Sequence, residues 1–130
     1  VPNTVGFSNA VHDGSTPQLQ ETSTAGLRLL TSGPAYSNPG DLLASDRVAH
    51  LFATLRADAD TVFIDAPPAG IVADAAILAP QVDGVVLVIS AFRTRREDAT
   101  RAKEQIERVH GSLLGVVLNN ARVDAIRYRY

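Results

Sequence analysis

Groups that could bind a metal ion and phosphate follow an apolar stretch in the middle of this sequence. Asp65 ends the stretch 61–65, "TVFID", and Pro67 and Pro68 come almost directly after it. A short apolar stretch bounded by turn residues predicts a buried strand. The prolines end its hydrogen-bond ladder, because neither has an N–H to donate. A carboxylate held at a strand end can bind Mg²⁺ through water, so Asp65 is predicted to belong to a magnesium–phosphate site.

An apolar strand that closes on aspartate is also the Walker B pattern of nucleoside triphosphatases, in which the aspartate helps to hold Mg²⁺ near the phosphates. The alternative is that Asp65 only caps the helix after it. Asp74 lies nine residues further along the chain and is a second candidate for the same phosphate space. Its alternative role is that of an acid favoured by a helix N-terminus.

Arginines follow a second apolar stretch, 84–90, "GVVLVIS". Arg93, Arg95 and Arg96 come just after it, and the planar guanidinium group suits phosphate. The alternative is a basic helix face in contact with water. An arginine-rich helix start is not favoured by the helix dipole, which argues for another purpose.

Two asparagines close a third apolar stretch, 113–119, "LLGVVLN". Asn119 is its last residue and Asn120 follows. A side-chain amide carries both a donor and an acceptor, so it can bind the edge of a purine. The alternative is an ordinary turn, in which asparagine is common.

The elements that position these groups alternate between strands and helices. The predicted strands cover residues 27–33, 61–65, 84–90 and 113–119, and the predicted helices cover residues 7–11, 41–56, 70–82 and 94–111. Apolar strands alternating with helices predict an α/β fold, a parallel sheet with helices on both faces. In open sheets of this kind, ligands bind at the carboxyl ends of the strands. Asp65, Arg93 and Asn119 are all predicted at this edge.

Explicit end signals mark the helix 94–111. Thr94 and Glu97 have the spacing of a capping box, in which the two side chains satisfy backbone N–H groups of the first turn. Gly111 stands where a left-handed residue often ends a helix.

Composition limits the classes of function. The 130 residues include no cysteine, which excludes disulfides and thiol catalysis. Residues 93–130 carry nine bases against five acids, short of the basic footprint of a nucleic-acid-binding protein. No apolar run approaches the roughly 18 residues of a membrane span. We expect a single domain over 1–130 in a cytoplasmic protein.

This domain is predicted to have three parts. Residues 1–26 form a polar irregular segment, residues 27–119 the α/β core, and residues 120–130 a basic tail that contains Tyr128 and Tyr130.

Taken in order, the pieces "GFSNAVHDG", "SNPGDLLASDRV", "VFIDAPPAG" and "LLGVVLNN" resemble the C-terminal part of the bacterial tyrosine kinases. This family regulates capsular and exopolysaccharide synthesis and belongs to the MinD/ParA-like branch of P-loop ATPases. The resemblance implies part of a P-loop NTPase fold, Rossmann-like in architecture, with ATP and Mg²⁺ as cofactors of the complete domain. It also implies that Asp65 is the Walker B aspartate and that the edge asparagine, Asn119 or Asn120, contacts adenine. Tyr128 and Tyr130 resemble the tyrosine-rich tail that such kinases autophosphorylate in trans.

The sequence departs from the family pattern in one respect. It contains neither the Gly-Lys-Ser/Thr loop of Walker A nor the acidic Walker A′ motif, and its single lysine, Lys103, lies in a predicted helix. A phosphate-binding loop needs consecutive backbone N–H groups and a lysine. We therefore expect a piece of the complete domain that alone neither binds ATP well nor transfers phosphate. The missing segment would supply the central strand of the sheet. Its absence would leave the apolar strands on either side unpaired.

The sequence thus favours part of an ATP-dependent protein tyrosine autokinase at the inner face of the plasma membrane. Its expected partners are a transmembrane activator or polysaccharide copolymerase domain and, in the complete protein, further copies of itself. No nucleic-acid partner is expected. The alternatives are a partition or site-selection ATPase of the MinD/ParA type, whose D-x-P-A-G stretch "DAPPAG" also resembles, and a non-catalytic relative that acts through protein contacts.

Overall fold

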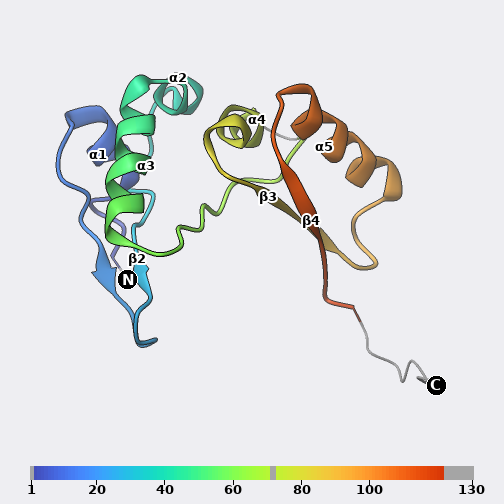
Figure 1. The fold of residues 1–130 in the computed structure, drawn as a ribbon, viewed down its shortest axis with the longest axis horizontal. Helices are drawn as coiled ribbons and strands as arrows, with labels where there is room; N and C mark the ends of the chain where they lie inside the picture. Colours follow the sequence, from blue (N-terminus) through green and yellow to red (C-terminus); the bar gives the residue numbers. More distant parts are fainter. Residues whose placement is uncertain (1, 71–72, 122–130) are drawn as a thin grey trace. The chain divides into compact units, whose positions relative to one another are not determined.

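The computed structural model describes residues 2–70 and 73–121 of the chain (Figure 1). They form two compact units, which divide between Asp65 and Ala66 and are described here one at a time. The first unit contains α1 (Phe7–Asp13), β1 (Gln20–Glu21), β2 (Arg28–Leu29), α2 (Pro39–Leu43) and α3 (Asp46–Asp58). The second contains α4 (Asp74–Leu78), a 3₁₀ turn (Ala79–Gln81), β3 (Val85–Ser90), α5 (Arg96–Arg108) and β4 (Leu113–Asn119).

The core of the first unit lies between α1 and α3. Its fully or almost fully buried apolar residues are Ala10, Val11, Val48, Leu51 and Phe52. Their spacing places them on one face of each helix, as is typical of amphipathic helices that pack against each other. Arg47 of α3 donates to the backbone carbonyls of Val11 and His12 at the end of α1. This contact satisfies carbonyls that a helix leaves without partners at its C-terminus.

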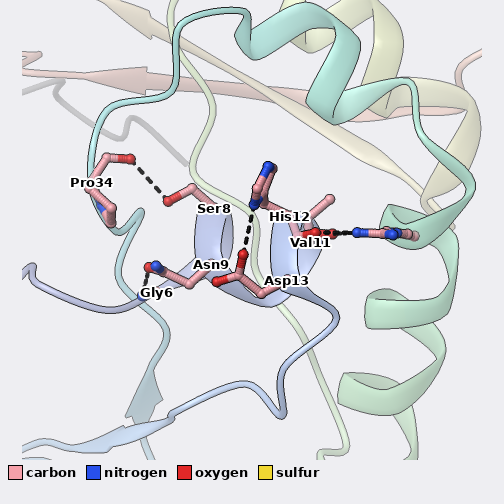
Figure 2. Close-up of polar contacts among 8 residues, drawn as sticks. Gly6, Ser8, Asn9, Val11, His12, Asp13 and Pro34 are labelled. Atoms are coloured by element: carbon pink, nitrogen blue, oxygen red, sulfur yellow. Dashed lines mark hydrogen bonds and ion pairs between the residues drawn. The ribbon is translucent and has the colours of Figure 1, made fainter.

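The N-terminus of α1 is held by the segment that follows β2. The Phe7 and Ser8 amides donate to the carbonyls of Thr31 and Ser32, at 2.7 and 2.9 Å. The Ser8 hydroxyl donates to the Pro34 carbonyl at 2.9 Å, as Figure 2 shows. This approach is close enough that a Cβ on Gly6 would lie 2.1 Å from the Thr31 oxygen. Glycine is therefore required at position 6.

Helix α1 extends two residues beyond its predicted end at residue 11, and two other elements of the first unit differ more from the prediction. Of the predicted strand 27–33, only Arg28–Leu29 forms a strand, and it pairs with β1 in antiparallel fashion. The predicted helix 41–56 is two helices, α2 and α3, separated at Ala44 and Ser45. Arg28 joins β2 to the end of α3, because its guanidinium donates to the Asp58 carboxylate and backbone carbonyl, both at 2.7 Å.

The predicted strand 61–65 is wrong for the structure described here. The segment is irregular, and Phe63 is 90% exposed. A strand needs a neighbour whose backbone groups complete its hydrogen bonds. No strand among residues 2–70 and 73–121 pairs with 61–65. The apolar residues of this segment favour burial in a sheet, but none of the described strands pairs with it.

The second unit confirms the α/β prediction with a parallel strand pair. The pairing runs from Val85 opposite Leu113 to Ser90 opposite Asn119, with one irregularity near Val86. Helix α5 packs against both α4 and β4, and the core residues are Leu78, Ala79, Ala102 and Ile106. The helices leave part of the sheet uncovered, since apolar side chains of β3 and β4 remain half exposed or more, among them Val88, Leu114 and Leu118.

Both predicted ends of α5 are corrected. The N-cap is Arg95 rather than Thr94, and no side chain caps the helix there. The Thr94 hydroxyl instead accepts a hydrogen bond from the Ser90 amide. The left-handed residue after the helix is His110, with φ of 59°, rather than Gly111. Position 111 requires glycine for space, because a Cβ there would lie 2.8 Å from side-chain carbons of Ala79 and Ile106.

Among the described helices, none combines the length and apolar character needed to cross a membrane.

The close approach at Gly6 gives a test of the first unit. We expect Gly6→Ala to lower the free energy of unfolding by about 1–3 kcal/mol, because the new methyl group forces the backbone away from Thr31. Gly40→Ala is the matched control: nothing lies within 4 Å of a Cβ there, and alanine is favoured in a helix. Urea unfolding followed by circular dichroism measures both. Equal unfolding midpoints for the two variants would contradict the described contact.

Candidate functional site

Asp65 lies at the end of the first unit. Its side chain is exposed, and the residues before it form no strand. The sequence prediction that a rigid strand end holds this carboxylate is therefore not met in the described structure. The remaining described candidates belong to the second unit.

Asp74 is the first residue of α4 and is half-buried. An acid in the first turn of a helix interacts favourably with the helix dipole. This position fits the structural alternative given above for Asp74. A catalytic role for Asp74 remains a prediction that no contact in the described structure supports.

The ends of β3 and β4 lie together, as the parallel topology predicts. Ser90 and Asn119 are opposite each other in the register. The Ala91 amide donates to the Asn119 carbonyl at 2.8 Å, and the Asn120 side-chain nitrogen donates to the Ser90 hydroxyl at 3.2 Å. The chain segments that leave the two strands are thus hydrogen-bonded to each other at one edge of the sheet.

A tight turn after β3 presents the arginines at this edge. The Ser90 carbonyl accepts hydrogen bonds from the amides of Arg93 and Thr94, at 3.2 and 3.0 Å. The Ser90 amide in turn donates to the Thr94 hydroxyl at 3.2 Å. Arg93 and Arg95 are both exposed. Their guanidinium groups are available for an anion, and the turn that carries them is fixed by three hydrogen bonds.

The two asparagines at the end of β4 are exposed, and each uses one of its two amide functions in a hydrogen bond within the protein. The Asn119 side-chain oxygen accepts a hydrogen bond from the Asn120 amide at 2.8 Å. Asn120 is left-handed, with φ of 57°, a conformation that asparagine tolerates. Within the described ranges, neither the side-chain nitrogen of Asn119 nor the side-chain oxygen of Asn120 has a hydrogen-bond partner. One donor and one acceptor are therefore free to bind the edge of a heterocyclic base.

Phe92 stands at the tip of the turn between Ser90 and Thr94, and the sequence analysis did not single it out. Its side chain is 86% exposed and its φ is 64°. The left-handed conformation costs a residue with a Cβ about 1–2 kcal/mol. The available signal was an aromatic residue directly before a group of arginines, at the end of an apolar strand.

No group of three or more histidine, cysteine, aspartate or glutamate side chains that could hold a metal ion occurs in the described part of the chain. Mg²⁺ is often held by only one or two carboxylates, with water and substrate phosphate as its other ligands. The single carboxylate of Asp65 is compatible with that mode of binding. Its role toward magnesium stays a prediction.

Polar residues of α1 border a shallow hollow in the first unit, of about 150 Å³. Among the residues that line it, His12 Nδ1 lies 2.7 Å from an Asp13 carboxylate oxygen (Figure 2), and the centroids of the His12 and Tyr36 rings are 5.2 Å apart. No pattern in the sequence predicts this hollow. Because Ser8 and Asn9 bond to neighbouring backbone groups, the contacts here serve to position α1.

Tyr128 and Tyr130, the predicted phosphoacceptors, lie outside the described residues. Their role stays a prediction.

Comparison with known proteins adds to this geometry. No family model matches the chain. The tyrosine-protein kinase YwqD of Bacillus subtilis is 38% identical over 123 residues, which is 93% of this chain. The tyrosine-protein kinase CpsD of a Streptococcus pneumoniae serotype 4 strain is 36% identical over 110 residues, or 85% of the chain. The chain is a homologue of the bacterial tyrosine kinases.

Solved structures of bacterial tyrosine kinase domains are similar to this chain. The kinase domain of VpsO has a TM-score of 0.84 at 31% identity and matches 92% of this chain and 60% of its own. The kinase domain of the Escherichia coli tyrosine kinase ETK has a TM-score of 0.89 at 25% identity and matches 100% of this chain and 52% of its own. The P-loop NTPase-like α/β fold implied by the sequence resemblance is thus confirmed.

The chain spans about half the length of the curated relatives it matches, 52% of YwqD and 48% of CpsD. The activity, substrates and partners of the whole relatives are for that reason proposals when applied to this chain.

The turn 90–94 can be tested directly. Thr94→Val removes the hydroxyl that accepts the Ser90 amide, and we expect hydrogen exchange at that amide to become roughly five- to tenfold faster, since one hydrogen bond contributes about 1 kcal/mol. Thr100→Val makes the same change on the exposed side of α5 and is the control. Exchange followed by NMR measures the difference. Unchanged protection in Thr94→Val would show that the turn is held by other contacts.

Proposed function

We propose that this chain is part of an ATP-dependent protein tyrosine autokinase that acts in capsular or exopolysaccharide synthesis. The observation that carries the proposal is the shared edge of β3 and β4, where exposed arginines and free amide groups lie at hydrogen-bonded strand ends in a homologue of tyrosine kinases. This is the edge at which ligands bind in parallel α/β sheets.

Within this proposal, the described residues bind and orient the nucleotide. Asn119 and Asn120 bind the adenine edge, and Arg93 and Arg95 bind phosphate. In the complete domain Asp65 would hold Mg²⁺ through water, and the ion would supply positive charge beside the phosphoryl group. The acceptors are the hydroxyl groups of Tyr128 and Tyr130 in a second copy of the protein.

We propose that the phosphate-binding loop comes from a segment other than these 130 residues, because no Gly-Lys-Ser/Thr sequence occurs among them. The proposed partner is a transmembrane activator or a polysaccharide copolymerase domain, which places the protein at the inner face of the plasma membrane. The names of the relatives support the kinase over a partition ATPase of the MinD/ParA type.

Autophosphorylation of the full-length gene product tests the activity. With ATP and Mg²⁺, the wild type should acquire phosphotyrosine in the tail, and Asp65→Asn should lower the rate at least tenfold, because the side chain loses the charge that holds the metal. Asp60→Asn makes the same change five residues earlier and should not alter the rate. An antibody against phosphotyrosine and mass spectrometry of the tail give the readout. A tail that stays unmodified in the wild type would exclude the kinase.

Nucleotide binding by the 130 residues alone tests the origin of the phosphate loop. We expect isothermal titration calorimetry with ATP and Mg²⁺ to show no measurable binding, because a phosphate loop supplies consecutive backbone N–H groups and a lysine that this chain lacks. Micromolar affinity would contradict the claim that another segment is required.

A further inference from the structure

Phe92 is held in a fixed position with its side chain in solvent. The turn that carries it has three hydrogen bonds between Ser90 and residues 93 and 94. The left-handed φ of 64° at Phe92 follows from this turn. Glycine adopts that conformation without strain, so the turn itself does not require a phenylalanine. The ring must be explained by something other than the fold of the turn.

The environment of Phe92 differs from that of the other strongly exposed phenylalanine. Phe63 is 90% exposed, but it lies in an irregular segment whose apolar pattern predicts burial in a sheet. Phe92 follows a strand that is already paired in the second unit, and it stands beside charged residues. Pairing of a further strand would therefore explain the exposure of Phe63 and leave that of Phe92 unexplained.

Polar groups of two kinds lie next to Phe92. On the strand side, the Ala91 amide is bonded to the Asn119 carbonyl at 2.8 Å, which brings the free amide groups of Asn119 and Asn120 to the same strand ends. Along the chain, Arg93 and Arg95 follow directly, and both are exposed. A flat apolar ring, hydrogen-bonding amides and guanidinium groups together suit a ligand that has a heteroaromatic base and a phosphate group.

We propose that Phe92 is a nucleotide-binding residue whose ring stacks on the purine base. This inference rests on the proposed function, since it adds a residue to the same nucleotide site. Stacking on an aromatic side chain tolerates any base, because every base has a π face. Phe92 then provides affinity for the base, and Asn119 and Asn120 provide discrimination between adenine and guanine.

The test uses the full-length gene product and four variants, of which three concern the ring or a left-handed backbone conformation and the fourth is Asn119→Ala. Phe92→Gly removes the ring and also relieves the left-handed strain, so its stability should be equal to or higher than that of the wild type. Phe92→Trp keeps an aromatic face. His110→Gly is the matched control, because it relieves a similar φ of 59° at the other end of α5. Urea unfolding confirms that each variant folds.

The binding measurement compares ATP with inorganic tripolyphosphate in calorimetry. We expect Phe92→Gly to weaken ATP and GTP binding by about tenfold, a typical loss when an aromatic stacking partner is removed, and to leave tripolyphosphate binding unchanged. Phe92→Trp and His110→Gly should bind ATP as the wild type does. Asn119→Ala should reduce the difference between the binding affinities for ATP and GTP.

The outcomes separate this inference from the proposed function. A wild type that binds no ATP would contradict the proposed function. A wild type that binds ATP, with unchanged affinity in Phe92→Gly, would overturn the stacking role alone. If Phe92→Gly weakened the binding of ATP and of tripolyphosphate equally, the stacking role would be overturned as well, because the ring would then affect phosphate binding rather than base binding. A change in self-association with no change in ATP affinity would show that the ring contacts protein rather than a base.

Discussion

The parallel hydrogen bonds between β3 and β4 determine where the candidate ligand-binding groups of the second unit lie. The register ends with Ser90 opposite Asn119, so the two strands end side by side. A left-handed residue follows each strand, Phe92 after β3 and Asn120 after β4. A shift of this register by one residue would turn every side chain of β4, that of Asn119 included, to the other face of the sheet. The arrangement of arginine, amide and aromatic groups thus depends on backbone pairing, and the contacts of Ser90 with the Asn120 and Thr94 side chains add to it.

The sequence predicted the elements of the second unit well. The strands 84–90 and 113–119 appear within one residue of their predicted bounds, as β3 and β4. Continuous apolar runs were enough to predict these two strands, because the strands pair with each other and a helix connects them. The shared position of Arg93 and Asn119 followed from the same reasoning, since parallel strands end at one edge.

The wrong predictions have a common physical cause. A local sequence pattern does not show which other segment or group the residue will contact. The segment 61–65 has the composition of a buried strand, but pairing is a property of two segments, and none of the described strands is its neighbour. The capping box at Thr94 failed because the same hydroxyl accepts the Ser90 amide, a competing bond that fixes the preceding turn. Gly111 was assigned to a left-handed position, whereas the structure needs it for space beside Ala79 and Ile106. Phe92 escaped notice because its backbone conformation is not visible in the sequence.

The irregular segment at 61–65 also bears on how the chain avoids misassembly. Val62, Phe63 and Ile64 are consecutive apolar residues of high strand propensity, and residues of this kind promote cross-β association in longer exposed segments. A carboxylate follows them at Asp65, and the prolines at 67 and 68 follow within three residues. Charges and prolines at the borders of an apolar segment act as gatekeepers, because they oppose the stacking of identical chains. The carboxylate proposed to bind magnesium and the prolines after it therefore also oppose aggregation, and replacing them would change the solubility of the chain.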